Sequence, residues 1–177
     1  MTGFDIQPLG PSHDRATFAC GEPSLDDYLK TKARKEHELG FSAAFVMTPV
    51  AQPSVIAGYY TLSALSVEVT GIPEPLRKRF PRYPVVPVTL LGRLARSLDY
   101  QGQGVGEMLL IDALNRAQSA ADSVGSHAVV VDPIDERARA FYEACGFLPL
   151  VGTLRLFLPM ATIRMLNLDD LGASDKR

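Results

Sequence analysis

Three glycines within five positions, Gly102, Gly104 and Gly106, stand directly before a segment with helical periodicity. Glycine lets the backbone approach a ligand closely, because no Cβ is in the way. The N-terminus of a following helix adds a partial positive charge and free N–H groups. The stretch from Gln101 to Gly106 therefore predicts a binding site for a phosphate or pyrophosphate group.

Two common phosphate-binding loops do not match this stretch. A Walker A loop ends in Gly-Lys followed by Ser or Thr, whereas Gly106 is followed by Glu107. A dinucleotide fingerprint reads G-x-G-x-x-G at the start of a βαβ unit, and here the spacing is one residue shorter and falls in the middle of the chain. ATP and dinucleotides are therefore disfavoured as ligands of this loop.

The elements that must position the loop follow from the hydrophobic pattern. We expect a strand over 88–96 directly before it and a helix over 107–121 directly after it. A continuous apolar run over 127–131 predicts a buried strand, and a helix over 134–144 and a strand over 154–160 complete this half. Strands that alternate with helices in this way indicate an α/β fold built on a mixed sheet.

The first half of the chain is read in the same way. It predicts one helix over 25–39, strands over 41–47 and 55–69, and a short helix over 73–80. A chain of 177 residues, 46% of them hydrophobic, has enough apolar material for one core. We therefore expect a single domain over 1–165 and a flexible tail over 166–177.

Composition excludes several classes of protein. The net charge of −2 argues against a uniformly basic nucleic-acid binder. No apolar run reaches the length of a membrane span and no secretory signal is visible, so we expect no membrane association and a cytoplasmic location. The two cysteines are far apart and form no CxxC motif, so neither a metal site nor a disulfide framework is expected.

Basic residues are nonetheless gathered in two stretches. One holds Lys30, Lys32, Arg34 and Lys35, and the other holds Arg77, Lys78, Arg79 and Arg82, with Arg93 and Arg96 further along. Each stretch is either a solvated helix face or part of a docking surface for a polyanion.

A second motif lies at the end of the expected helix over 134–144. The segment from Ala138 to Phe147 contains Phe141-Tyr142 and, four residues later, Gly146-Phe147. With Gln101-x-x-Gly104-x-Gly106 after Arg93-Leu-Ala-Arg96, it resembles the signature of the GCN5-related N-acetyltransferases (GNAT). The resemblance implies a central twisted mixed sheet flanked by helices, in which splayed strands hold acetyl-CoA as the acetyl donor, with no metal.

The resemblance also implies roles for individual residues. Tyr142 would be the general acid that protonates the departing CoA thiolate, the alternative being a tyrosine that only fills the core. The residues implied in binding acetyl-CoA are Leu94, Ala95 and Arg96 for the pantetheine arm, Gln101, Gly102, Gln103, Gly104, Val105 and Gly106 for the pyrophosphate, and Arg139 and Phe141 beside it.

No general base stands out. Asp99, Glu107, Asp132 and His127 are all candidates. A base is not strictly required, because a free α-amino group has a pKa near 7.7 and is partly neutral at physiological pH. A lysine amine, with a pKa near 10.4, needs more help, so the missing base weakly favours an α-amine as the acetyl acceptor.

The first ninety residues carry a narrower resemblance. Residues 18–21, 25–29, 58–63 and 91–95 are similar to segments of the acetyltransferase toxins of toxin–antitoxin pairs. That group implies acetylation of aminoacyl-tRNA, a ribbon-helix-helix antitoxin that alone contacts DNA, and a homodimer. The residues expected to bind the tRNA are Arg93, Lys32, Lys35, Arg77, Lys78 and Arg79.

Two other functions are compatible with the sequence. The chain could acetylate a small amine or a protein N-terminus, which requires the same fold and donor. It could also act mainly as a binding module in a repressor complex with a DNA-binding antitoxin.

Overall fold

A computed structural model of the chain describes residues 3–166 and residue 168. The elements are, in order, β1 (Phe4–Pro8), α1 (Pro23–Thr31), α2 (Ala33–Leu39), β2 (Ala43–Pro49), β3 (Gly58–Glu68), α3 (Glu74–Arg77), β4 (Val85–Arg96), α4 (Val105–Ala121), β5 (Ala128–Val131), α5 (Glu136–Ala144), β6 (Leu148–Pro149), β7 (Leu156–Pro159) and α6 (Met160–Met165). Short 3-10 turns, η1 (Val69–Gly71) and η2 (Leu98–Tyr100), follow β3 and β4. The expected α/β organisation is confirmed.

The strands form a seven-stranded mixed sheet in the order β1-β2-β3-β4-β5-β7-β6. The β1–β2 and β2–β3 pairs are antiparallel, β4 and β5 are parallel, and β7 is antiparallel to both β5 and β6. The helix α4 connects β4 to β5, as a parallel pair requires a crossover. The glycine loop therefore lies between β4 and the helix of this crossover.

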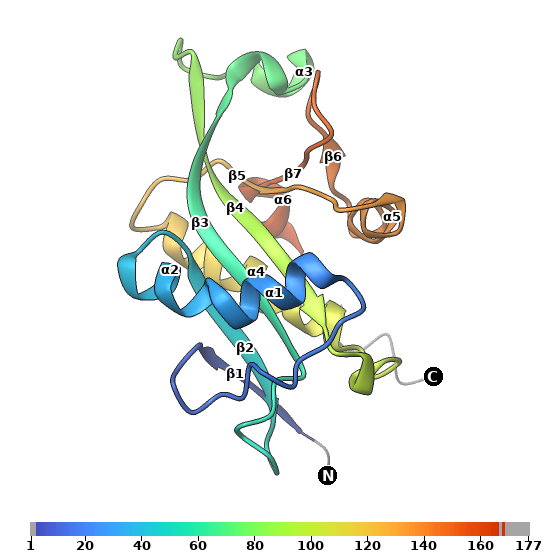
Figure 1. Ribbon diagram of the computed structural model, residues 1–177. Helices are drawn as coiled ribbons and strands as arrows, with labels where there is room; N and C mark the ends of the chain where they lie inside the picture. Colours follow the sequence, from blue (N-terminus) through green and yellow to red (C-terminus); the bar gives the residue numbers. More distant parts are fainter. Residues whose placement is uncertain (1–2, 167, 169–177) are drawn as a thin grey trace. The chain divides into compact units, whose positions relative to one another are not determined.

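The chain forms two compact units, and the described residues of the first are 3–63, 92–115 and 168. In this unit α1 and α2 cover one face of β2 and β3, and the first turns of α4 lie behind them (Figure 1). Tyr28 and Leu29 of α1 pack with Val46 of β2 and with Tyr59 of β3 in one apolar cluster. The neighbouring Tyr60 points to the other face, where its hydroxyl donates to the carboxylate of Asp112 on α4.

The second unit contains residues 64–91 and 116–166. Its core joins Val86 and Val88 of β4 with Val130 of β5 and Phe157 of β7. All four residues of β5 are fully buried, which explains the continuous apolar run in the sequence. This unit carries α5 and therefore Tyr142.

The expected helix over 25–39 is wrong in its continuity. It begins at Pro23 with Glu22 as N-cap, and it divides into α1 and α2 at Lys32, whose φ and ψ are −124° and −36°. The side chain of Arg15 donates to the carbonyl oxygens of Leu29 and Lys30 at 3.4 Å and 3.2 Å. A side chain remote in sequence thus satisfies carbonyl groups at the end of α1, which no local pattern indicates.

Three elements were not predicted: β1, β6 and α6. They are short, and β1 and β6 are the edge strands of the sheet. The expected tail over 166–177 lies outside the described residues except for Leu166 and Leu168. A single domain over 1–165 stays a prediction.

Candidate active site

The glycine loop has the backbone that its composition predicts. Gly102 and Gly104 have φ angles of +76° and +74°, which residues with a side chain rarely adopt. The α4 helix begins at Val105, and the N–H of Met108 donates to the carbonyl oxygen of Gly104 at 3.0 Å. The glycines therefore turn the chain sharply, so that the first N–H groups of a 17-residue helix lie beside the loop.

The space beside Gly102 and Gly106 is open. A Cβ built on Gly102 or on Gly106 would meet no other atom within 4 Å. The loop residues 101–103 are exposed, whereas Val105 is fully buried and anchors the start of the helix. An open surface lined by backbone and by a helix N-terminus is suited to bind an anionic group of this size.

One close packing contact fixes the anchor. Gly58 of β3 lies so near to α4 and β4 that a Cβ there would be 2.7 Å from Leu109 Cδ1, 2.9 Å from the Ala95 oxygen and 3.0 Å from Val105 Cγ1. Only a glycine lets β3 approach the helix this closely. Gly58 thus supports the position of the loop without belonging to it.

The end of β4 offers backbone groups for a strand-like ligand. Its pairing with β5 ends at Leu91, opposite Val131, the last residue of β5, while β4 continues through Leu94, Ala95 and Arg96. Ala95 is 4% exposed, and the N–H of Ser97 donates to the Ala57 oxygen at 2.8 Å. The end of the strand is therefore held firmly.

Tyr142 lies in the second unit, on α5, whose N-cap Asp135 accepts a hydrogen bond from the Ala138 N–H at 2.8 Å. Its ring packs edge-on between Phe141 and Phe147, with centroid distances of 5.3 Å and 5.4 Å. Burial raises the pKa of Tyr142 above its usual value, and Cys145 nearby adds to the effect. The phenol therefore keeps its proton at physiological pH.

Arg139, one turn before Tyr142, already has partners. Its Nε is 2.7 Å from Glu143 Oε1, and another guanidinium nitrogen donates to the Leu154 oxygen at 3.4 Å. A role for Arg139 beside the donor stays a prediction, as does the role of Phe141.

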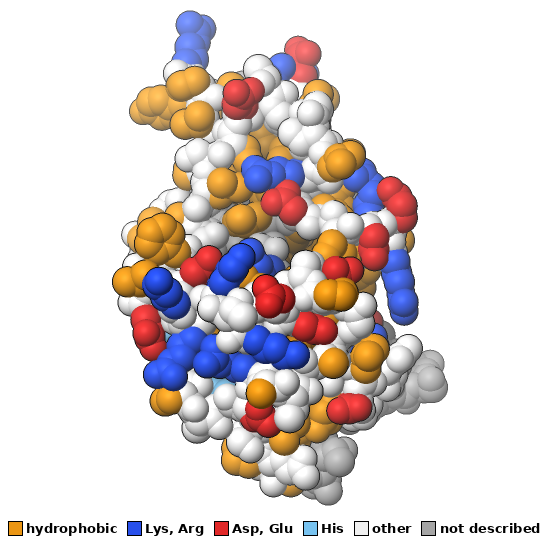
Figure 2. Space-filling view, in the orientation of Figure 1, with side chains coloured by type: hydrophobic (Ala, Val, Ile, Leu, Met, Phe, Trp, Pro, Cys, Tyr) orange, Lys and Arg blue, Asp and Glu red, His pale blue; other side chains and the backbone are white. Residues whose placement is uncertain are grey.

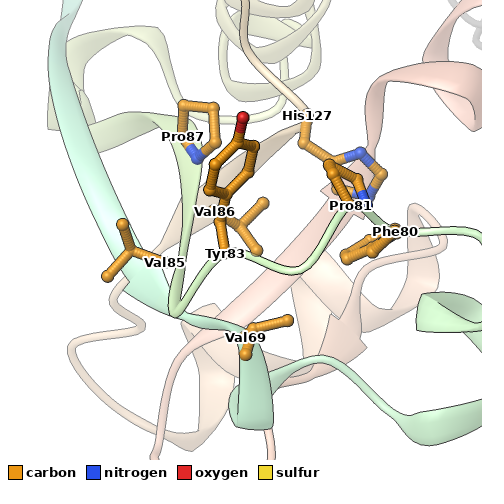
Figure 3. Close-up of a pocket in the computed structure, with 8 residues that line it drawn as sticks. All are labelled: Val69, Phe80, Pro81, Tyr83, Val85, Val86, Pro87 and His127. Carbon is orange, nitrogen blue, oxygen red and sulfur yellow. The ribbon is translucent and has the colours of Figure 1, made fainter.

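His127 is the candidate base whose surroundings are best defined. It lines an apolar pocket of about 190 Å³ together with Phe80, Pro81, Tyr83 and Pro87 (Figure 3). Its ring meets Phe80 edge-on at 4.6 Å, and burial lowers its pKa, so the imidazole is neutral. These contacts are those of a structural histidine.

The other candidate bases are spread along the chain. The carboxylate of Asp132 is 2.8 Å from Arg155 Nε, Asp99 lies in η2, and Glu107 is exposed in the first turn of α4. Within residues 3–166 and 168, no three His, Cys, Asp or Glu side chains are grouped so that they could hold a metal ion, and no helix is long and apolar enough to span a membrane.

The basic residues fall into both units. Lys30, Lys32 and Lys35 are exposed on α1, at the junction and on α2, and Lys and Arg side chains gather over these helices (Figure 2). Arg15, which caps α1, lies beside Lys30 in an open pocket and was not predicted. Arg77 ends α3 in the second unit, and Lys78 and Arg79 follow it.

Arg93 is held by an aromatic cluster that was also not predicted. Its Cζ lies 3.5 Å from the centre of the Tyr28 ring. The Tyr28 hydroxyl donates to Glu36 Oε2 at 2.6 Å, and the Tyr59 ring is nearly parallel to that of Tyr28 at 6.4 Å. These residues come from α1, α2, β3 and β4, so no local sequence pattern could have joined them.

The sequence matches one family of proteins, both by its family model and by individual relatives. Residues 57–149 match the model of the acetyltransferase (GNAT) domain. A tRNA-acetylating toxin of Mycobacterium tuberculosis is 38% identical over 168 residues, which cover 94% of this chain and 98% of the toxin. A probable toxin TacT of Sinorhizobium fredii is 36% identical over 170 residues, 91% of this chain and 93% of the relative.

Solved structures agree over nearly the whole chain. A mutant of KacT superposes with a TM-score of 0.87 at 31% identity, and AtaT complexed with acetyl-methionyl-tRNA gives 0.86 at 32% identity; each match covers 92% of this chain and 98% of the other. The AtaTR complex bound with acetyl-CoA gives 0.80 at 32% identity, covering 92% and 96%.

Structures that contain a bound partner also match the fold of this chain. AtaT bound to the C-terminus of the antitoxin AtaR gives a TM-score of 0.80 at 32% identity, covering 93% of this chain and 98% of that one. The KacTA–DNA complex gives 0.76 at 30% identity, covering 95% and 100%. The chain therefore belongs to the GNAT acetyltransferases, in the group that includes the tRNA-acetylating toxins.

Proposed function

We propose that this chain is the toxin of a toxin–antitoxin pair, and that it transfers the acetyl group of acetyl-CoA to the α-amino group of aminoacyl-tRNA. The observation that carries this proposal is its likeness, over more than nine-tenths of its length, to a tRNA-acetylating toxin and to AtaT with acetyl-methionyl-tRNA. A fold alone does not determine an acceptor, and therefore the full-length match matters.

The glycine loop and the end of β4 would bind the donor. The N–H groups at the start of α4 would bind the pyrophosphate, and the side chain-free surface at Gly102 and Gly106 leaves room for it. The backbone of Leu94, Ala95 and Arg96 would pair with the pantetheine amides as a further strand does.

Tyr142 would supply the proton that the leaving group needs. The neutral amine attacks the thioester carbonyl, so that an N–C bond forms and the C–S bond breaks. The amine loses a proton to solvent, the CoA sulfur takes one from the Tyr142 hydroxyl, and the phenol is reprotonated from solvent. Because burial raises the pKa of Tyr142, the donor form is fully populated at neutral pH.

A dedicated general base is not part of this proposal. An α-amino group has a pKa near 7.7, so a substantial fraction is neutral at physiological pH. Asp132 is paired with Arg155, and His127 packs against the Phe80 ring. Both observations are consistent with a reaction in which water accepts the proton.

The basic side chains would bind the phosphates of the acceptor. Lys32 and Lys35 are exposed beside Lys30 on the surface of α1 and α2, and Arg93 lies on β4 of the same unit. Arg77, Lys78 and Arg79 are proposed as a second set of contacts. Phosphate contacts of this kind make affinity dependent on salt.

The proposed partners follow from the same group. The complexes of AtaT with AtaR and of KacTA with DNA support an antitoxin partner that contacts DNA. A ribbon-helix-helix antitoxin, a toxin homodimer and a cytoplasmic location complete the proposal.

The test is acetyl transfer by the purified chain. It is incubated with radiolabelled acetyl-CoA and a mixture of charged tRNAs, with uncharged tRNA and free amino acids as controls. We expect label on the charged tRNA alone. Transfer only to small amines or protein N-termini would favour a different acceptor, and growth arrest without any transfer would favour a binding module in a repressor complex.

A further inference from the structure

Arg93 has no carboxylate partner within the part of the chain that the structure describes. Among residues 3–166 and 168, ion pairs join other arginines to Asp or Glu, and none involves Arg93. Its side chain is only partly exposed, so solvent screens its charge incompletely. An arginine in this state is suited to bind an anion from outside the chain, and its planar donors match a phosphate.

Tyr28 fixes the orientation of this cation. The ring is 3% exposed, its hydroxyl is tied to Glu36 at 2.6 Å, and the Tyr59 ring lies nearly parallel to it. The distance of 3.5 Å from Arg93 Cζ to the ring centre is that of a face contact. A guanidinium held by its face keeps its in-plane N–H donors available.

We infer that Tyr28 is a positioning residue for the acceptor: its ring holds the Arg93 guanidinium in place to bind a phosphate of the tRNA. This rests on the proposed function. Tyr28 does not touch the reacting atoms in this account. Its role is to present Arg93 in one orientation.

The location of the pair favours the acceptor over the donor. Tyr28 and Glu36 belong to α1 and α2, the same helices that expose Lys30, Lys32 and Lys35. Arg93 thus adds a cation held by an aromatic ring to a surface of exposed lysines. The loop over 101–106 already offers the donor pyrophosphate a site of its own.

Three variants separate the parts of this arrangement. Tyr28→Leu removes the ring, Tyr28→Phe keeps the ring and removes the hydrogen bond to Glu36, and Arg93→Lys keeps the charge and removes the planar contact. We expect Tyr28→Leu and Arg93→Lys to raise KM for aminoacyl-tRNA about 3- to 10-fold, the range of one cation–π contact, with kcat and KM for acetyl-CoA unchanged. Tyr28→Phe should have a smaller effect in the same direction.

The salt dependence of tRNA binding gives a readout that a purely structural role does not change. Binding is followed by fluorescence anisotropy of labelled charged tRNA, apart from catalysis. Loss of one phosphate contact should lower the slope of log affinity against log salt by about 0.7 to 1 in Tyr28→Leu and in Arg93→Lys. The matched control is Arg164→Lys, because Arg164 is exposed, is paired with Asp122 and lies on α6, outside the basic surface, and its slope should stay as in the wild type.

The variants separate loss of the Tyr28–Arg93 contact from loss of stability. Tyr28 is buried, so Tyr28→Leu alone could act through stability, but Arg93→Lys leaves the core intact. Equal slopes and equal KM in wild type and Arg93→Lys would overturn the inference. If the wild type binds charged tRNA with the expected salt response but transfers no acetyl group, the proposed function fails while the inference stands.

Discussion

The glycine loop and the cluster around Arg93 lie in the same compact unit and are built in opposite ways. The loop is one stretch of six residues whose first three are exposed, and its proposed binding role depends on backbone and on open space. The cluster joins side chains from α1, α2, β3 and β4, and its two tyrosines are buried. A change in the loop should therefore affect ligand binding and leave stability intact, whereas a change in the cluster should affect both.

Tyr142 combines the two cases, because it belongs to a sequence motif as the loop does and is buried as the tyrosines of the cluster are. Tyr142→Phe removes one oxygen and keeps the ring between Phe141 and Phe147. We expect kcat to fall about 100-fold or more, because the leaving thiolate loses its proton donor. Acetyl-CoA binding measured by calorimetry should persist.

The control for this variant is Tyr83→Phe, which removes the same atom from a tyrosine that is 67% exposed. It should retain wild-type kcat. Equal turnover in Tyr142→Phe and the control would remove Tyr142 from the chemistry and leave it a core residue.

The loop itself gives the cleanest separation of binding from stability. Gly106→Trp places a side chain where a Cβ meets no atom within 4 Å, in the space proposed for the pyrophosphate. We expect acetyl-CoA to bind roughly 100-fold more weakly, because several charge-assisted hydrogen bonds are lost. The unfolding temperature should change little, since the first carbon of the added side chain meets no other atom within 4 Å.

Gly125→Trp is the matched control, because a Cβ at Gly125 also meets nothing within 4 Å and this glycine lies outside the loop. Its acetyl-CoA affinity should equal that of the wild type. If both variants bind acetyl-CoA normally, the pyrophosphate lies elsewhere.

A substitution at Gly58 tests the effect of a change at a closely packed position. Gly58→Ala would bring a methyl group to 2.7 Å from Leu109 Cδ1 and 2.9 Å from the Ala95 oxygen. We expect a loss of about 1 to 3 kcal/mol in the free energy of unfolding, which lowers the melting temperature by roughly 2 to 10 °C. Acetyl-CoA affinity should fall too, because Val105 anchors the loop.

Calorimetry of Gly106→Ala provides the comparison for this variant. It adds the same methyl group to an open helical position and should melt at or slightly above the wild-type temperature. A Gly58→Ala protein as stable as Gly106→Ala would show that β3 can shift without cost.

The smallest expected effect concerns pH. The acid form of Tyr142 is the active one in this account, and burial raises its pKa, so that form persists to higher pH than in a free tyrosine. The rate should rise as the acceptor amine, with a pKa near 7.7 or below, loses its proton, and then stay level up to about pH 9. Initial rates from about pH 6 to about pH 9 check this. A decline above pH 8 that is absent in Tyr142→Phe would contradict it.

The features that depend on neighbouring residues can be predicted from the sequence, whereas contacts between separate elements cannot. The loop, α4, β5 and α5 follow local patterns of glycine spacing and apolar periodicity, and the resemblance to the GNAT signature singles out Tyr142. The junction of α1 and α2 depends on Arg15, and the orientation of Arg93 depends on Tyr28, Tyr59 and Glu36. These contacts form only after the chain has folded, because their partners come from different elements, such as α1 and β4.

Edge elements were missed for a related reason. β1 and β6 are defined by pairing with β2 and β7 more than by their own composition. β-propensity depends on context, so a short strand at the edge of a sheet has little signal of its own.

The position of the transferred acetyl group tests the central claim most directly. Wild-type protein and acetyl-CoA are incubated with one tRNA charged either with an amino acid or with the matching α-hydroxy acid, and the 3′-terminal adenosine ester is released by nuclease and analysed by mass spectrometry. We predict that the aminoacyl-adenosine gains one acetyl group, located on its α-nitrogen, and that the hydroxyacyl-adenosine gains none. Acetylation of both esters, or of neither while a small amine is acetylated, would contradict the account.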